Sequence, residues 1–230
     1  MILRKWEELP DYMRNQQVRP YYEMLEKKKH QLLFKRIFDI CSSLILIVIL
    51  SPLLIFFAIW IKIDSQGPVF YRQERITQYG RIFKIFKFRT MVVNADKIGT
   101  LVTIKNDSRI TEVGEKIRKY RIDEIPQLFN VLLGDMSFVG TRPEVKKYVE
   151  KYTDEMYATL LLPAGITSLA SIEFKDEDEI INEYTSEIRS VDEVYIDEVL
   201  PRKMEFNLNS LKEFNFFNEI GVMIKTVLKV

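Results

Sequence analysis

The chain has 230 residues, a formal net charge of +1, one cysteine and one histidine. A near-neutral chain of this length predicts one domain, or one domain with an appendage, and argues against the strong positive field of a nucleic-acid-binding protein. Cys41 alone cannot form an internal disulfide, which fits a reducing, cytosolic setting, and His30 alone excludes a multi-histidine zinc site.

Residues 1–33 are predicted to form an N-terminal cytosolic extension. They are charged from the start and lack the apolar centre and small-residue cleavage site of a signal peptide. Tyr22, Leu25, Leu32 and Leu33 have the spacing of a loose helical stripe.

The most apolar segment runs from Ile40 to Ile61 without a charged residue. About 20 such residues can span a bilayer as a helix. However, Ser51-Pro52 lies at the middle, where proline bends a helix and frees a backbone carbonyl. Basic residues also flank both ends, so charge gives no direction of insertion. On these residues alone, a spanning helix and a re-entrant hairpin both stay open.

Residues 65–91 are basic, with a single acid, and they alternate between aromatic or aliphatic and basic side chains. Short strands and an interfacial segment both fit this pattern. Basic and aromatic residues together can bind single-stranded nucleic acid. Directly after an apolar segment, anionic membrane lipids and a pyrophosphate are the favoured partners, and no nucleic acid is expected. A basic surface without a catalytic part is the simpler alternative.

Residues 92–108 are polar and rich in turn formers, so they are either a loop over the site or an ordinary surface loop. A helix is predicted from Thr111 to Tyr120, with Thr111 as its N-cap. This helix would bring Arg118 toward Asp123.

The candidate site is centred on Asp123 and Glu124. They precede a short apolar helix that is predicted to have Pro126 in its first turn and to end at Gly134. The helix dipole favours charged carboxylates at this end. Arginines lie before and after, and no serine, histidine or cysteine stands in a catalytic pattern, so the residues point to metal-assisted chemistry on a phosphate. The alternative is a capped helix with ordinary surface charges.

The segment from Asp123 to Glu144 resembles the core signature of the bacterial sugar transferase family, the monotopic phosphoglycosyl transferases. The resemblance extends from Lys35 to the C-terminus, and the Lys-Phe-Arg-Thr-Met run from Lys87 to Met91 resembles a family motif near the active site. Relatives have a broken re-entrant helix with a Ser-Pro pair at this place. The resemblance therefore implies a re-entrant membrane helix over 34–64, broken at Ser51 and Pro52, in which a serine hydroxyl helps to satisfy the freed backbone group.

The implied fold is α/β and membrane-associated. A compact, mainly helical cytosolic catalytic domain with short strands and interfacial helices would cover 65–230. It would lie on the cytoplasmic face of the bacterial inner membrane, and a homodimer is one possible state that the sequence does not decide.

The implied reaction is transfer of a sugar-1-phosphate from a UDP-sugar to undecaprenyl (polyprenyl) phosphate, the first step of a bacterial surface glycan. Asp123 would be the nucleophile, forming a phosphosugar–aspartyl intermediate and releasing UMP, and Glu124 would assist as a base or metal partner. Asp123 and Glu124 would hold Mg²⁺ with substrate oxygens. The implied substrate-binding residues are Lys87, Arg89, Arg118, Thr141, Arg142, Pro143 and Arg202.

The last third of the chain departs from the family pattern. A helix is predicted from Val145 to Leu161 and a turn over 163–167, where Ser168 stands in place of the usual glycine. Residues 175–198 are strongly acidic and are predicted to be a solvated helix or loop. Asn207 replaces a usual carboxylate. These departures bear on sugar specificity. The apolar residues after Phe214 are a separate feature, and they either pack on the core or dock on the membrane.

Two other functions stay open from the sequence. One is a membrane-attached hydrolase that cleaves the nucleotide-sugar pyrophosphate with water. The other is a non-catalytic membrane scaffold for polysaccharide assembly, which Asn207 faintly favours.

Overall fold

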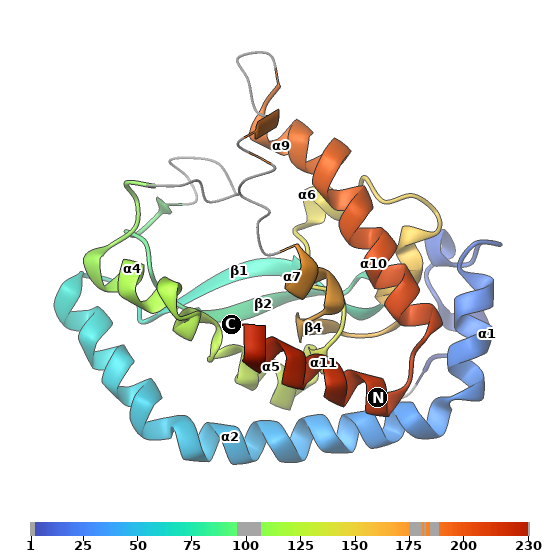
Figure 1. The fold of residues 1–230 in the computed structure, drawn as a ribbon, viewed down its shortest axis with the longest axis horizontal. Helices are drawn as coiled ribbons and strands as arrows, with labels where there is room; N and C mark the ends of the chain where they lie inside the picture. Colours follow the sequence, from blue (N-terminus) through green and yellow to red (C-terminus); the bar gives the residue numbers. More distant parts are fainter. Residues whose placement is uncertain (1–2, 96–106, 175–180, 182, 185–188, 230) are drawn as a thin grey trace.

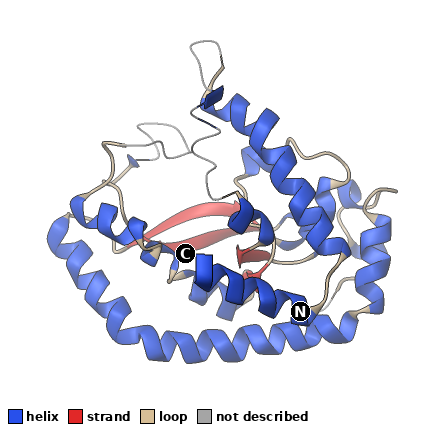
Figure 2. Ribbon diagram, viewed as in Figure 1, coloured by secondary structure: helices blue, strands red, loops and turns tan. Residues whose placement is uncertain are grey.

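The computed structural model describes residues 3–95, 107–174, 181, 183–184 and 189–229. In these ranges the chain is mainly helical and has two small two-stranded sheets, which confirms the predicted helical architecture with short strands (Figures 1 and 2). The acidic run at 176–179 and most of the predicted 92–108 loop lie outside the described residues.

The helices are α1 (Arg19–Lys27), α2 (Lys29–Asp64), α4 (Glu112–Lys119), α5 (Gln127–Leu133), α6 (Lys146–Val149), α7 (Leu169–Glu173), α9 (Val191–Val194), α10 (Leu200–Lys212) and α11 (Phe216–Lys229). The strands are β1 (Phe70–Ile76), β2 (Ile82–Phe88), β3 (Met136–Val139) and β4 (Ala164–Thr167). Single 3-10 or π-helical segments are Trp6–Glu8, Asp11–Met13, Gln78–Gly80, Ile122–Glu124, Met156–Leu161 and Tyr195–Val199.

The apolar segment lies in α2, a helix of 36 residues that runs along one side of the molecule (Figure 1). Helical structure continues through Pro52 and the ribbon bends along its course, so the predicted break is a bend within one helix. Pro52 has no N–H to donate to the Val48 carbonyl, and the Ser51 hydroxyl donates to that carbonyl at 2.8 Å instead. The predicted role of the serine is confirmed. By length and composition, α2 is sufficient to cross a membrane.

Buried charges fasten the first half of α2 to the rest of the chain. The Lys35 ammonium is 2% exposed, donates to the Val139 carbonyl at 2.8 Å and pairs with Glu219 of α11 at 2.6 Å. Asp39, one turn further along, accepts a hydrogen bond from the Phe138 amide at 3.3 Å. Because a buried charge without a partner is costly, these contacts fix α2 against β3 and α11.

Arg36 joins α2 to the end of α5. Its guanidinium donates to the carbonyls of Val131 and Leu132, at 2.6 and 2.9 Å, in the last turn of that helix. Gly134 then ends α5 as predicted, in a left-handed conformation with φ of 87°. A cation here satisfies unpaired carbonyls and complements the negative end of the helix dipole. The membrane-helix candidate thus stabilises the helix that follows Asp123 and Glu124.

The basic segment forms strands rather than an interfacial segment. β1 and β2 pair antiparallel, with Phe70 opposite Phe88 and Ile76 opposite Ile82. Asn130 of α5 holds the edge of β2, since its side chain accepts from the Phe86 amide at 2.7 Å and donates to the Lys84 carbonyl at 3.1 Å. This contact places α5 beside the hairpin.

Two of the predicted elements are corrected in the C-terminal half. The predicted turn over 163–167 is β4, which pairs in parallel with β3. Gly165 permits this, because a Cβ there would lie 2.2 Å from the Gly140 nitrogen. The predicted helix over 145–161 is two short segments, α6 and Met156–Leu161. Thr153 and Asp154 lie between them, and both residue types favour turns over helix interiors.

The first 28 residues contribute to the largest apolar core. Met13, Val18 and Leu25 are fully buried there together with residues of α6 and α10, such as Tyr148 and Leu200. The structure places the start of α2 at Lys29, five residues before the predicted membrane segment.

We expect Arg36→Met to destabilise the fold by about 1–2 kcal/mol, because it removes two charge-assisted bonds to the end of α5. The measurement is the thermal unfolding midpoint of the purified protein in detergent. Lys62→Met is the matched control, since Lys62 is exposed in the last turn of the same helix. Equal midpoints for the two variants would contradict the capping role.

Candidate functional site

Local structure brings the two central carboxylates to one turn. Thr111 caps α4 as predicted, with its hydroxyl accepting from the Gly114 amide at 3.0 Å, and α4 carries Arg118. The 3-10 turn Ile122–Glu124 follows and holds Asp123 and Glu124. Pro126 then leads directly into α5. The predicted order of helix, carboxylate pair and short helix is confirmed.

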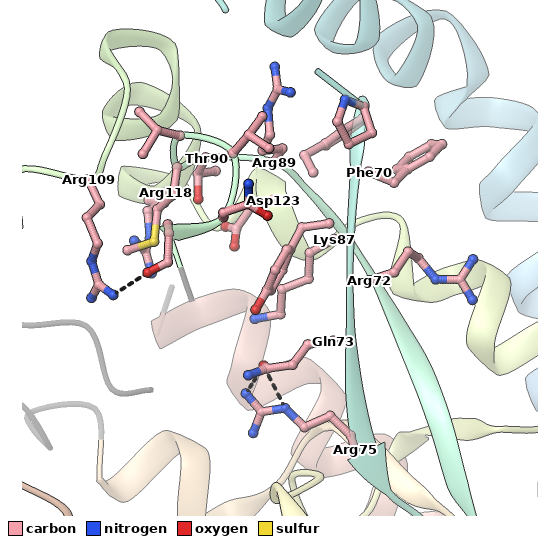
Figure 3. A pocket seen from close by; sticks show the side chains of 18 residues that line it. Phe70, Arg72, Gln73, Arg75, Lys87, Arg89, Thr90, Arg109, Arg118 and Asp123 are labelled. Atoms are coloured by element: carbon pink, nitrogen blue, oxygen red, sulfur yellow. Dashed lines mark hydrogen bonds between the residues drawn. The ribbon is translucent and has the colours of Figure 1, made fainter. Parts of the chain in front are cut away.

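Asp123 lies in the wall of a cavity of about 520 Å³ beside the β1–β2 hairpin (Figure 3). Its side chain is buried, at 9% exposure, and accepts no hydrogen bond within the described ranges. Burial raises the pKa of Asp123, against the opposing attraction of the Lys87 ammonium. The cavity wall contains six cationic side chains together with uncharged ones such as Phe70 and Phe88; the cationic residues are Arg72, Arg75, Lys87, Arg89, Arg109 and Arg118.

Glu124 has a different environment from its neighbour. Its Oε1 accepts from the Lys87 ammonium at 2.8 Å and from Nη2 of Arg142 at 2.6 Å. Burial alone would raise the pKa of Glu124, but Arg142 and Lys87 outweigh burial and hold that pKa well below its usual range. Glu124 is therefore a permanent anion between two cations.

This arrangement suits chemistry on a polyanion. Two adjacent carboxylates whose pKa values are pushed apart usually have different roles. Glu124 neutralises and positions two cations, which leaves Asp123 as the carboxylate open to the cavity. The cationic wall can neutralise phosphate oxygens, and arginine forks are well matched to them.

The residues fit a magnesium ion only in part. Within the described ranges no group of three or more acidic, histidine or cysteine side chains could enclose a metal. Asp123 has carboxylate oxygens to offer, whereas those of Glu124 already face Arg142 and Lys87. An ion here would therefore take Asp123 and several oxygens from a phosphate substrate and water, which is how Mg²⁺ commonly binds.

The other predicted residues lie at different distances from this centre. Arg118 and Lys87 lie beside Asp123, and Arg89 extends away from it (Figure 3). The Arg89 guanidinium donates to the carbonyls of Ser65 and Gln66, at 2.7 and 2.9 Å, just after α2. Its predicted contact with substrate stays a prediction.

Thr141, Pro143 and Arg202 line neither cavity beside the carboxylates. The backbone carbonyl of Thr141 accepts a hydrogen bond from the Gly165 amide at 2.9 Å, which supports the backbone next to Arg142. Arg202 is exposed and pairs with Glu198 at 3.6 Å. Asn207 is buried in the wall of a small cavity, about 40 Å³, that contains neither Asp123 nor Glu124.

The structure also reveals site residues that the sequence reasoning missed. Arg75 of β1 lines the Asp123 cavity, donates to Gln73 and to the Pro143 carbonyl, and has a pKa lowered by burial. Tyr71, Gln73 and Arg75 alternate along β1, so strand periodicity could have indicated them once the segment was known to be a strand. Arg109 also lines this cavity, and no periodic pattern in the sequence indicated it.

A buried network supports the segment after Arg142. Tyr195 donates to Glu144 at 2.6 Å, and the Lys203 ammonium donates to the Tyr195 hydroxyl at 3.0 Å. Lys203 rather than its neighbour Arg202 therefore connects α10 to this segment. Buried polar groups of this kind are stable only when each has partners.

Comparisons with known proteins show which family this sequence matches. The family model described as bacterial sugar transferase matches residues 30–230. A Bacillus subtilis protein named for undecaprenyl-phosphate N-acetylgalactosaminyl 1-phosphate transfer is 43% identical over 135 residues, 59% of this chain and 75% of that protein.

Two longer relatives match over most of this chain. The UDP-N-acetylgalactosamine-undecaprenyl-phosphate N-acetylgalactosaminephosphotransferase of Aeromonas hydrophila is 36% identical over 84% of this chain. The UDP-glucose:undecaprenyl-phosphate glucose-1-phosphate transferase of Escherichia coli K12 is 34% identical over 86%. The matches span only 42% and 40% of those two relatives.

The opposite environments of the two carboxylates predict opposite effects on stability. Asp123→Asn should raise the unfolding midpoint at pH 7, because a carboxyl whose pKa is raised by folding destabilises the fold when ionised. The gain should vanish below the unfolded-state pKa of about 3.9, where aspartate is neutral in both states. Glu124→Gln should instead cost about 1–3 kcal/mol, because it leaves two cations without their anion. Midpoints in detergent at pH 7 and at about pH 3 measure both, and equal shifts in one direction would contradict the assignment.

Proposed function

This chain belongs to the bacterial sugar transferase family, and on that premise we propose that it transfers a sugar-1-phosphate from a UDP-sugar to undecaprenyl phosphate. The observation that carries the proposal is the buried Asp123 carboxylate, which opens into a cation-lined cavity next to a neutralised Glu124. The names of the Aeromonas and Escherichia relatives supply the donor and acceptor classes.

In the first half of the reaction, an Asp123 oxygen attacks the phosphorus that bears the sugar. The bond from that phosphorus to the UMP oxygen breaks, and UMP leaves with the electron pair. The product is a phosphosugar–aspartyl enzyme. Lys87, Arg118 and Arg75 line the cavity around Asp123 and neutralise the pyrophosphate charge that would otherwise repel a carboxylate nucleophile.

Glu124 acts here mainly by electrostatics. A carboxylate whose pKa lies well below its usual range is a weak base near neutral pH. It holds Lys87 and Arg142 close to the reacting phosphate and lowers the repulsion between these two cations. The family resemblance implies a base or a metal partner, whereas the contacts of Glu124 with Lys87 and Arg142 favour a positioning role.

Mg²⁺ bound through Asp123 and substrate oxygens would supply further charge neutralisation of the pyrophosphate. The chain's own contribution is the cationic wall.

We also propose that the chain works at the cytoplasmic face of the membrane, with α2 as a re-entrant helix. In α2 the side chains of Ile45, Val48 and Ile49 are 57–65% exposed, which suits a lipid environment. In α11, Val227 and Leu228 are 80% and 79% exposed. Of the two roles that stayed open for the C-terminal apolar residues, this exposure supports membrane docking.

The covalent step predicts that Asp123→Asn abolishes turnover, because an amide cannot act as this nucleophile. Wild-type protein given UDP-sugar without lipid acceptor should release UMP in an amount close to that of the enzyme, and mass spectrometry should find the phosphosugar on residue 123. Asp154→Asn, an exposed acid outside the site, is the control.

Three results would count against this proposal. Wild-type rates in Asp123→Asn would show that Asp123 is not the nucleophile. Continuous UMP release with free sugar phosphate as the product would identify a hydrolase. Lack of any product from correctly folded protein with a range of UDP-sugars would favour a scaffold.

If α2 is a re-entrant helix, both of its ends should lie on the cytoplasmic side. In a Cys41→Ser background, His30→Cys and Lys62→Cys introduce exposed labels at the two ends. A membrane-impermeant maleimide should label both in inverted vesicles and neither in intact spheroplasts. Labelling of the two positions from opposite sides would show that α2 spans the membrane.

A further inference from the structure

A second cavity, of about 600 Å³, opens on Glu124 rather than on Asp123. Most of its wall is apolar and comes from α2, α5, β4, α7 and α11: Leu46, Leu50, Leu128, Ile166, Ile172 and Val227. Two of these side chains belong to the apolar half of α2 itself. Such a wall suits a hydrocarbon ligand and offers little to a nucleotide.

Two arginines also line this cavity. Arg142 pairs with Glu124 at 2.6 Å, and the Arg121 carbonyl accepts a hydrogen bond from the Glu124 amide at 3.1 Å. The Arg121 side chain is exposed and forms no ion pair with any residue that the structure describes. One cation is therefore available to a ligand in addition to Arg142. A mainly apolar wall that also contains two arginines matches an amphiphile with a phosphate head.

Arg121 occupies a backbone position that arginine does not favour. Its φ is 52° and its ψ is 22°, which is the left-handed region. Glycine or asparagine adopts this conformation more readily, and strained residues of this kind cluster at functional sites. Because this backbone conformation disfavours arginine, we attribute the arginine at position 121 to a role of its guanidinium.

Resting on the proposed function, we propose that this second cavity holds the phosphate end and first isoprene units of the polyprenyl phosphate acceptor, with Arg121 binding the acceptor phosphate. The donor, which has no hydrocarbon chain, enters the cation-lined cavity on the Asp123 side. The two substrates therefore reach the carboxylate pair through different cavities.

The contacts of Glu124 explain how the two cavities work on one phosphorus atom. Lys87 lines the donor cavity, Arg142 lines the acceptor cavity, and both donate to Oε1 of Glu124. In the second half of the reaction, an oxygen of the acceptor phosphate bonds to the phosphorus held on Asp123. The bond from phosphorus to the Asp123 oxygen breaks and its electron pair returns to the carboxylate. With a dianionic acceptor phosphate, no proton transfer is needed.

The test measures the two half-reactions separately in nanodiscs. The first is UMP release without acceptor, and the second is transfer of labelled sugar phosphate to added polyprenyl phosphate. Arg121→Gly removes the guanidinium and suits the left-handed backbone, and Arg121→Lys restores a cation. Val227→Trp fills the cavity. Leu228→Trp is its matched control, because Leu228 is equally exposed and does not line the cavity.

We expect Arg121→Gly to leave the amount of UMP released unchanged and to raise the KM for polyprenyl phosphate about tenfold or more, as for the loss of one charge-assisted bond. Arg121→Lys should recover part of this loss. Val227→Trp should slow transfer about tenfold without changing UMP release, and Leu228→Trp should change neither.

Other outcomes overturn the assignment. Unchanged transfer in Arg121→Gly and Val227→Trp, or an equal loss of both half-reactions, would show that the acceptor does not use this cavity. If Val227→Trp instead altered only binding to vesicles without polyprenyl phosphate, the cavity would hold bilayer lipid. Absence of UMP release from the wild type would mark a failure of the proposed function itself.

Discussion

The structure of this site depends on one anion held between two cations. Glu124 comes from the turn before α5, Lys87 from β2 and Arg142 from the segment after β3, and all three meet within hydrogen-bond distance. Each charge would be costly in a partly buried place without the others. Because the three side chains come from separate parts of the chain, their mutual neutralisation joins the hairpin, the central helix and the second sheet. Asp123 is left beside them as the carboxylate with a raised pKa and an open path to a ligand.

The apolar helix α2 is fixed by side-chain contacts to the elements that surround the site. Lys35 and Asp39 anchor its first half to β3 and α11, and Arg36 caps the far end of α5. The helix that would contact lipid therefore also stabilises the helix that starts next to the carboxylate pair. In the proposed reaction a water-soluble donor and a lipid acceptor meet at one phosphorus atom, and this coupling would hold that point at a constant depth relative to α2.

Two cavities of similar size meet at the carboxylate pair and differ in character. One is lined by Asp123 and six cationic side chains among uncharged ones, and the other is lined by Glu124, two arginines and mainly apolar side chains. The proposed ping-pong reaction would use one covalent centre for two ligands in turn. Under that proposal, each ligand would reach the centre through its own cavity.

Local signals in the sequence determined much of this protein: the cap at Thr111, the end of α5 at Gly134, the bent apolar helix with its Ser-Pro pair, and the carboxylate pair among arginines. These features depend on neighbours within a few residues, so the sequence alone carries them. Tertiary structure decided the rest. The predicted turn over 163–167 is β4 because Gly165 lies against Gly140, Arg75 lines the Asp123 cavity from a distant strand, and Arg202 is exposed while Lys203 is buried. These outcomes depend on contacts between residues far apart in the chain, which no local pattern encodes.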